Sequence, residues 1–353
     1  MQHTKIKSEN ELILHLALGR ITFLSFQEKI ILSNKLDSPR SIVLLSIEDI
    51  SRLINRRLSS RVIWNGEENL RMAEIALHYC KTLGIHIILN TDLEYPELLR
   101  QINDPPYLLF CRGNIKALKS EKNVSVVGTR RLTPAGKLAA KSFAYDAVKD
   151  GCTIVSGLAN GADGYAHQGA LDAFYDFVDN DQNTDVLGKT IAVLPCAIDE
   201  VVPLGHKTLA TQIIKNGGCL ISEYEPKMSM ANWHFVARNR IIAGLSPATV
   251  VIEAPAGSGA LITVDFALED GRDVMFHESS FREEAKKLNQ SSKKKLEIDF
   301  AQGKISKYKV ENTVEKYVEA GAPIIKNYKD YCECISEEPG KRAQTYIQGE
   351  LFQ

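Results

Sequence analysis

Short apolar runs alternate with amphipathic segments from about residue 85 onward. Several runs, such as Val124–Gly128 and Thr190–Leu194, are apolar on both faces, as strands buried in a parallel sheet must be. This alternation predicts an α/β fold with a doubly wound sheet. The predicted strands are His86–Leu89, Tyr107–Cys111, Val124–Gly128, Thr153–Gly157, Thr190–Leu194, Cys219–Glu223, Thr249–Ala254, Asp273–Phe276 and Pro323–Lys326, and the predicted helices between them are Pro134–Asp150, Asp163–Ala173, Lys207–Asn216 and Ala260–Glu269.

The first 83 residues have a different, mostly helical pattern. Ser46 and Asp49 offer the two ends of a capping box for one helix. Residues 67–83 are rich in helix formers, and Gly84 can end that helix. The chain is therefore predicted to comprise an N-terminal helical domain over residues 1–84, an α/β domain over 85–335 and a loose C-terminal tail over 336–353.

Two segments interrupt the α/β pattern. Tyr175–Thr184 is polar and acidic and is predicted to be a surface excursion. Residues 281–310 carry nine Lys or Arg and four Asp or Glu, which makes this insert locally basic. We favour a solvated helix and loop for the insert, because charge runs usually form solvated faces. The alternative is a basic arm that helps to hold a polyanion.

Composition and charge narrow the class of protein. Hydrophobic residues are 44% and charged residues 25% of the 353 residues, which fits a globular protein and excludes disorder, collagen or coiled coil as the main architecture. A net charge of -1 excludes a globally basic nucleic-acid binder but leaves room for a locally basic groove. Seven scattered cysteines without CxxC predict reduced thiols. No leader, membrane span or metal motif is evident, so we expect a cytoplasmic protein without a metal.

The first candidate site follows the strand Val124–Gly128. Gly128, Thr129 and Arg130 lie at the carboxyl end of a predicted parallel strand and just before a helix that begins near Pro134. Backbone N–H groups and the helix dipole favour an anion at such a turn. Arg130 and Arg131 can add bidentate phosphate contacts. The sequence lacks GxGxxG, so a dinucleotide fingerprint is absent; the alternative is a pair of surface arginines.

A second turn of the same kind follows the strand Thr153–Gly157. Ser156 and Gly157 can present a hydroxyl and N–H groups to an anion. Asp163 can cap the next helix, and His167 lies one turn later on the same face. A catalytic Asp–His pair is one interpretation. We favour a structural pair, because no partner nucleophile accompanies it.

The third candidate combines aromatic and basic residues. Trp233 and Phe235 precede Arg238, Asn239 and Arg240 at the start of an apolar helical stretch. Cations interleaved with aromatic rings suit a phosphate backbone with stacked bases. The alternative is that the rings belong to the core and the arginines are merely exposed.

A fourth candidate is a Gly-Ser-Gly turn after the strand Thr249–Ala254. Ser258 and Gly259 open the next helix in a third turn that suits an anion. The turn is no Walker A motif, and Glu253 is the acidic residue beside it. A connection chosen for tight packing is the alternative. Taken together, three such turns at strand ends predict a ligand with several phosphates.

At these motifs the chain resembles the DprA family of DNA-processing proteins, also called Smf. The resemblance runs in family order over roughly residues 85–276. It is carried by YPELLRQINDPPYLLFCRG, VSVVGTRRLTPAG, TIVSGLANGADGYAHQGAL, TIAVLPCAIDEVVP, LISEYEP, ARNRIIAGLS, VVIEAPAGSGALIT and ALEDGRDV.

The resemblance implies an extended Rossmann-like domain that binds single-stranded DNA without sequence preference. It also implies a homodimer that protects incoming DNA and helps to load RecA in natural transformation and recombination, with no catalytic activity and no cofactor. The family's phosphate pocket carries over to Arg130 in the VGTR turn. The remaining carried-over residues are Ser156, Gly157, Phe235 for base stacking, Arg238, Asn239, Arg240, Ser258 and Gly259.

The chain departs from the family pattern in several places. LPCAIDEVVPLGH places Cys196, Val202 and His206 where a small residue, Tyr and Asn are usual. Phe276-His277-Glu278 replaces the usual VPG, and the charged stretch after it is longer than usual. RITFLSF stands where a Gly-rich hairpin is expected.

Two other functions remain open at this point. A nucleotide-processing enzyme would use the same turns and would need Glu253 or Asp163 as its acid, but the chain lacks the PGGxGT-like turn of such enzymes. An adaptor whose main role is protein contact would use the altered LPCAIDEVVPLGH stretch and the basic insert. Retention of all three phosphate turns argues against the adaptor.

Overall fold

The computed structural model describes residues 7–59 and 62–336, and its central feature is one mixed sheet. The described strands follow the order β1-β2-β6-β5-β4-β3-β7-β8-β9. β1 and β2 pair antiparallel, β2 pairs antiparallel with β6, and the remaining pairs are parallel. The strands are β1 (His86–Leu89), β2 (Leu108–Gly113), β3 (Asn123–Val127), β4 (Thr153–Ser156), β5 (Thr190–Val193), β6 (Cys219–Ser222), β7 (Ala248–Val251), β8 (Asp273–His277) and β9 (Ile324–Ile325). The predicted α/β, Rossmann-like doubly wound fold is confirmed.

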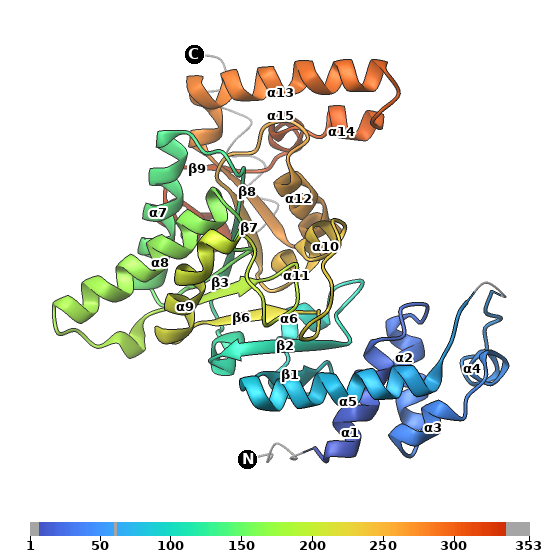
Figure 1. Cartoon of the computed structure of the whole chain (residues 1–353). Coiled ribbons are helices and arrows are strands. Elements are labelled where there is room, and N and C mark those ends of the chain that lie inside the picture. The colour runs from blue at the N-terminus through green and yellow to red at the C-terminus, as the bar shows by residue number, and fades with distance from the viewer. Residues whose placement is uncertain (1–6, 60–61, 337–353) are drawn as a thin grey trace.

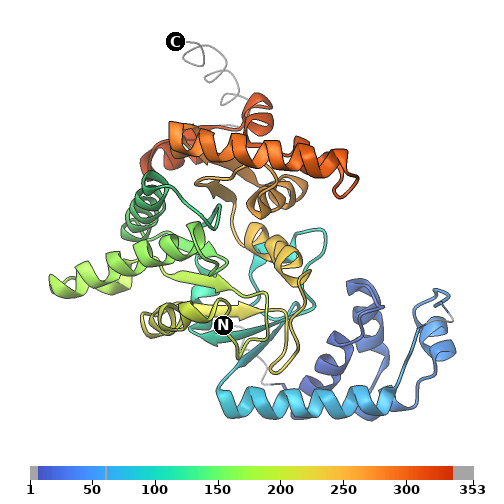
Figure 2. The same cartoon turned by 45° about the horizontal axis from the view of Figure 1, so that its top comes forward.

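Helices cover both faces of the sheet, as Figures 1 and 2 show. α7 (Pro134–Lys149), α8 (Ala162–Asp179) and α9 (Lys207–Lys215) connect β3 to β6 on one face. The chain then crosses over, and α10 (His234–Ala237), α11 (Asn239–Gly244) and α12 (Gly259–Glu269) lie on the other face. The short α6 (Glu97–Arg100) and α15 (Val314–Glu319) complete the second layer. Strand side chains alternate between two apolar clusters, so that Val126 faces α7 while Val127 faces α12.

The described part of the N-terminal region contains five helices beside β1 and β2. They are α1 (Glu9–Gly19), α2 (Phe26–Lys35), α3 (Pro39–Val43), α4 (Ile47–Leu53) and α5 (Gly66–Leu83). The Ser46–Asp49 capping box predicted from the sequence is present at α4, and Gly84 ends α5 with φ 62°. One hydrophobic cluster joins these helices to the sheet through Phe110 and Leu220. At residue 84 the chain therefore changes from helices to the strand–helix pattern, while one hydrophobic core continues across this point.

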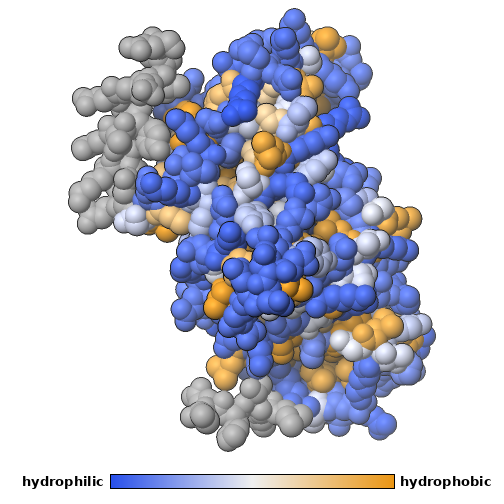
Figure 3. Space-filling view, turned by 90° about the vertical axis from the view of Figure 1, so that its left-hand side faces the viewer, coloured by the Kyte–Doolittle hydropathy of each residue, from blue (hydrophilic) through white to orange (hydrophobic). Residues whose placement is uncertain are grey.

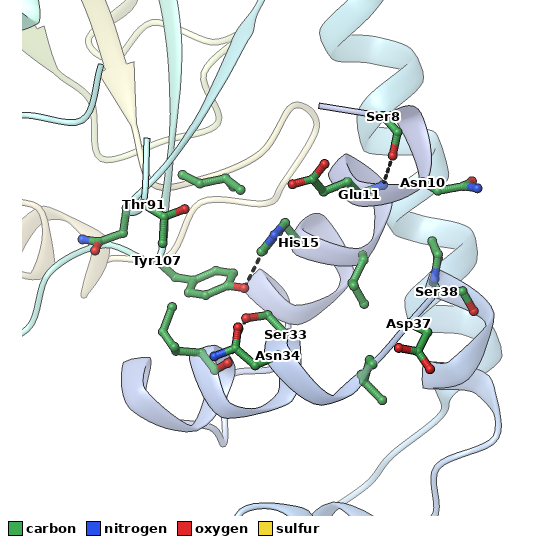
Figure 4. Close-up of a pocket in the computed structure, with 16 residues that line it drawn as sticks. Ser8, Asn10, Glu11, His15, Ser33, Asn34, Asp37, Ser38, Thr91 and Tyr107 are labelled. Carbon is green, nitrogen blue, oxygen red and sulfur yellow. Dashed lines mark hydrogen bonds between the residues drawn. The ribbon is translucent and has the colours of Figure 1, made fainter. Parts of the chain in front are cut away.

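A polar pocket of about 500 Å³ lies between α1, α2 and the β1–β2 edge (Figure 4). At its centre His15 Nδ1 and the Tyr107 hydroxyl are 2.7 Å apart, which links a helix to the sheet edge. Burial lowers the pKa of His15, so the imidazole is held neutral at this contact.

The two irregular segments are more helical than the sequence indicates. The segment from Tyr175 lies at the surface as predicted, but its first half is helical because α8 continues to Asp179. Tyr145 donates a hydrogen bond of 2.7 Å to Asp176, which fixes this last stretch of α8 to α7. The basic insert forms α13 (Glu283–Ala301) and α14 (Lys307–Glu311), in accord with the solvated helix that the charge run favours.

The last described helix, α16 (Tyr328–Ser336), packs against α7. The rings of Tyr328 and Tyr331 lie at 5.7 and 5.8 Å from Phe143 in edge-on contacts. The predicted tail 336–353 lies outside the described residues except for Ser336. The side of the molecule toward α7 and α8 is mostly hydrophilic, with apolar residues scattered over it (Figure 3).

None of the seven cysteines, all of which lie among the described residues, forms a disulfide bond. In the described part of the chain, no helix has the length and apolar character needed to cross a membrane.

His167 lies inside the layer between α8 and the sheet. The side chain is fully buried, and its Nδ1 is 2.7 Å from the hydroxyl of Thr190 on β5. Its Nε2 has no hydrogen-bond partner. Burial lowers the pKa of His167 to about 3, so the ring is neutral in the folded protein. His167 therefore acts as a core residue that fixes α8 to β5, and it is not bonded to Asp163.

Replacing Gly169 by Ala should destabilise the protein. A Cβ at this position would lie 2.1 Å from the backbone oxygen of Lys141, so α7 and α8 would have to separate. We expect the free energy of unfolding to fall by about 1–3 kcal/mol in urea denaturation. Gly205→Ala is the control, because nothing lies within 4 Å of its Cβ position. Equal stability of both variants would contradict the close approach of the helices.

Stability should depend on pH through His167. In the unfolded chain His167 is protonated below pH 6.5. In the folded protein the lowered pKa keeps His167 neutral down to about pH 3. The contribution of neutral His167 to the free energy of unfolding is therefore fully present above pH 6.5. It is lost as the pH falls below 6.5, by at most about 1.4 kcal/mol per pH unit. His167→Gln should show a flatter decline than the unsubstituted protein in denaturation at several pH values. Identical slopes would contradict the assignment.

Candidate nucleic-acid interface

The predicted turns meet at the carboxyl ends of β3, β4 and β7. β3 lies between β4 and β7, with Val124 opposite Ile154 and Val126 opposite Val250. After β3 the chain continues into α7 on one face, and after β7 it continues into α12 on the other. A crevice opens at such a switch point in an open α/β sheet, and ligands bind there. The tertiary structure thus brings the three motifs to one edge.

The turn after β3 is fixed on both sides by backbone contacts. The N–H of Thr129 donates to the carbonyl of Glu253 at 2.6 Å, and the N–H of Ala162 donates to the carbonyl of Thr129 at 3.2 Å. A Cβ on Gly128 would lie 2.7 Å from the Cβ of Ala162. Gly128 is therefore required for this close approach, and Arg130 follows it with its side chain exposed.

The side chain of Glu253 completes the connection between the ends of β3 and β7. Its carboxylate accepts hydrogen bonds from the N–H of Thr133 at 2.9 Å and from the Thr133 hydroxyl at 2.6 Å. Thr133 in turn caps α7 through the N–H of Gly136. Burial raises the pKa of Glu253, while the bonds from Thr133 oppose that shift. The Glu253 carboxylate is thus engaged in holding the turn.

A basic hollow of about 340 Å³ lies beside the Arg130 turn. None of its lining side chains is acidic; they are Arg130, Arg131, Leu132, Lys137, Asn160, Tyr165, Gln168 and His206, with Gly161 and Gly164. The guanidinium of Arg130 lies over the ring of Phe235 at 5.2 Å, and the ammonium of Lys137 lies 5.8 Å from the centre of the Tyr165 ring. Cations thus line an open, polar hollow together with the Tyr165 ring, and the Phe235 ring contacts Arg130 beside it.

Arg238 lies beneath this surface and not on it. It is 5% exposed, and its Nη1 donates to the carbonyl of Val193 at 2.7 Å. A Cβ on Gly157 would lie 1.7 Å from that Nη1 and 2.6 Å from Oδ2 of Asp163. Gly157 is therefore required by the side chains packed under it.

The charges of Arg238 and Asp163 support each other in this buried position. Burial lowers the pKa of Arg238, and the neighbouring Asp163 counteracts the shift. Burial raises the pKa of Asp163, and Arg238 counteracts that shift in turn. Asp163 also accepts a hydrogen bond from the N–H of Ala159 at 3.3 Å. The geometry favours an internal role for both side chains.

The neighbouring residues of the third motif also bond within the protein. Arg240 pairs with Glu223 at 2.7 Å and with Asp104 at 2.9 Å, and is 8% exposed. Asn239 donates to the carbonyl of Gly259 at 3.2 Å, which connects α11 to the start of α12. Among the predicted residues of the third motif, Phe235 is the one that contacts a residue lining the hollow, through the Arg130 guanidinium.

The two remaining predicted hydroxyls act locally. Ser156 is fully buried and donates to the carbonyl of Val126 at 2.6 Å. Ser258 caps α12 by accepting from the N–H of Ala260 at 3.3 Å. Next to it Gly259 is exposed, with nothing within 4 Å of its Cβ position. Of this turn, the α12 start at Gly259 is the part open to a ligand.

Helix α13 borders the turn after β7. The amide oxygen of Asn289 accepts from the N–H of Ala256 at 2.8 Å, and a Cβ on Gly257 would meet Leu296 at 2.8 Å. The basic insert is therefore attached to the edge of the site.

The sequence analysis missed several residues of the hollow. Tyr165 and Gln168 lie on the first turns of α8, and Lys137 lies on the first turn of α7. Each belongs to a helix that starts at a predicted turn, and this position is the signal that could have identified them. His206 appeared only as a departure from the family pattern; its Nδ1 lies 2.8 Å from the carbonyl of Leu158, which fixes the ring at the rim.

Comparisons with known proteins agree on the family. The model of the family described as DNA recombination-mediator protein A matches residues 86–335. DNA processing protein DprA of Bacillus subtilis is 36% identical over 191 residues, which are 54% of this chain and 60% of that protein. Protein Smf of Borreliella burgdorferi is 29% identical over 266 residues, covering 75% of this chain and 79% of that protein. Protein Smf of Synechocystis is 41% identical over 43% of its own length, so some relatives are matched over about half of their length.

Solved structures extend the similarity beyond the α/β region. DNA processing protein A from Streptococcus pneumoniae superposes with a TM-score of 0.62 at 27% identity, over 93% of this chain and 98% of that one. DNA processing protein A from Helicobacter pylori has the same fold, with a TM-score of 0.52 over 71% of this chain and 95% of that one. With the family model covering residues 86–335, we conclude that the chain belongs to the DprA/Smf family of DNA recombination-mediator proteins.

Proposed function

We propose that this protein binds single-stranded DNA, without sequence preference, in the basic hollow beside the Arg130 turn. The observation that carries the proposal is the Arg130 guanidinium over the Phe235 ring at the rim of a hollow with no acidic lining. Arg130, Arg131 and Lys137 can bind the phosphates of the strand, and an aromatic ring can stack on an unstacked base. The Helicobacter pylori relative, whose structure concerns its single-stranded DNA binding mode, supports the same class of ligand.

The proposed role is non-catalytic. The acids that a nucleotide-processing enzyme would need are Glu253 and Asp163, and both accept hydrogen bonds within the protein. His167 is buried against Thr190. A base-releasing activity would revive the enzyme hypothesis, and incubation with nucleoside monophosphates followed by detection of free base tests it.

We further propose that the protein acts as a cytoplasmic homodimer in natural transformation and recombination, where it protects incoming DNA and promotes loading of RecA. Support comes from family membership and from seven cysteines of which none forms a disulfide bond in the described part of the chain, which suits a reducing compartment. Light scattering of the purified protein tests the dimer, and co-purification with RecA tests the partner.

Binding to a labelled oligo-dT should be strongly salt-dependent and should prefer the single strand. Each phosphate contact should contribute about -0.7 to the slope of log affinity against log salt, because counterions are released. Fluorescence anisotropy across a salt series, with a matched duplex as competitor, measures both properties. Absence of binding at low salt, or preference for the duplex, would contradict the proposal.

Arg130→Ala should weaken binding to oligonucleotides of every sequence to a similar extent. Loss of one charge-assisted phosphate contact should reduce the affinity about tenfold and flatten the salt slope by about 0.7. Arg71→Ala is the matched control, because it removes an equal charge from an exposed position on α5, where Arg71 pairs with Glu68. Equal affinities for the two variants would exclude Arg130 as a phosphate contact.

A further inference from the structure

Trp233 is unusually exposed for its size. Its relative exposure is 62%, whereas tryptophan side chains are on average highly buried. It lies directly before α10 as the N-cap residue, two positions ahead of Phe235. The backbone of Trp233 is therefore less than one helical turn from the backbone of Phe235, whose ring contacts the Arg130 guanidinium.

The indole is supported by a buried pair of aromatic rings. Tyr224 and His234 stack at 3.9 Å with an interplanar angle of 13°. Both are buried, at 6% and 2% exposure. The plane of Trp233 is perpendicular to both rings, at 89° to His234 and 83° to Tyr224. These edge contacts orient the indole and leave most of it in solvent, so an aromatic surface is already in position for a ligand.

Three of the acidic residues near this segment are paired with basic side chains. Glu223 pairs with Arg240, Glu225 pairs with Arg20, and Asp199 pairs with Lys227. A polyanion that approaches Trp233 therefore meets ion pairs and not isolated carboxylates at these three positions. This pattern suits a nucleic-acid strand better than a surface with free acids would.

From this arrangement we propose that Trp233 is a second base-stacking site, which accepts a base of the strand next to the one at Arg130 and Phe235. The inference rests on the proposed binding of single-stranded DNA and extends the binding surface from Phe235 in α10 to the residue that precedes the helix. Stacking requires no particular base, because every base has a π face, so the site agrees with binding that lacks sequence preference.

Anisotropy with labelled oligo-dT tests the proposal through three variants. Trp233→Ala should weaken binding about 5-fold to 100-fold, the range expected for loss of one stacked base. Trp233→Phe keeps a ring and should restore most of the affinity. Val236→Ala is the matched control: it is 43% exposed and one turn away, but it offers no ring to a base. We expect its affinity to equal that of the unsubstituted protein.

An abasic oligonucleotide distinguishes stacking from an indirect effect on the phosphate site. Without bases, Trp233→Ala and the unsubstituted protein should bind equally. A loss with the abasic strand as large as with oligo-dT would overturn the stacking role. Circular dichroism of each variant verifies that the fold is retained.

Intrinsic fluorescence gives an independent readout. The chain has two tryptophans, and Trp64 lies in the N-terminal region with its indole N–H bonded to the carbonyl of Leu45. Oligo-dT should quench the emission of the unsubstituted protein and leave that of Trp233→Phe almost unchanged.

The outcomes separate this inference from the proposed function. If the unsubstituted protein fails to bind oligo-dT, the proposed function itself fails. If it binds and Trp233→Ala binds equally well, DNA binding stands and the stacking site is refuted. In that case the exposed Met228, Met230 and Trp233 would instead suit a protein partner.

Discussion

The site depends on how the ends of β3 and β7 are held together. These strands are neighbours in the sheet, but their chains depart to opposite faces. The bond from Thr129 N–H to the Glu253 carbonyl, with the Glu253 carboxylate on Thr133, connects the two departing chains. A buried carboxylate is costly unless it is hydrogen-bonded, so this acid enforces the position of the α7 start. The Arg130 turn is thereby fixed at the rim before any ligand binds.

The arginines of the motifs divide between two roles according to burial. Arg238 and Arg240 are buried and bonded to a carbonyl or to carboxylates, so they hold α10 and α11 against the strand ends. Arg130 and Arg131 are exposed and line the hollow. Desolvation explains the division, because a buried charge needs fixed partners while a ligand-binding charge must remain open to the phosphate.

Neighbouring elements give the site its boundaries. α13 is attached to the turn after β7 through Asn289, and the altered stretch after β5 contributes His206 to the opposite rim. Both belong to segments that depart from the family pattern. The family therefore defines the strand ends and their turns, while this chain's own residues shape the surroundings of the hollow.

The sequence by itself determined the strand–helix alternation, the capped start of α4, the end of α5 at Gly84, and the turns that carry Arg130, Gly157 and Gly259. Each of these depends on short-range patterns of apolar spacing, capping residues and glycine. Only the tertiary structure decided which motif side chains face solvent. Arg238 and Ser156 look like ligand contacts in sequence but face inward, and Tyr165 joins the hollow from α8, where only its place after a predicted turn marks it. The reason is physical: burial and partners depend on contacts between segments far apart in the chain, and local patterns do not encode them.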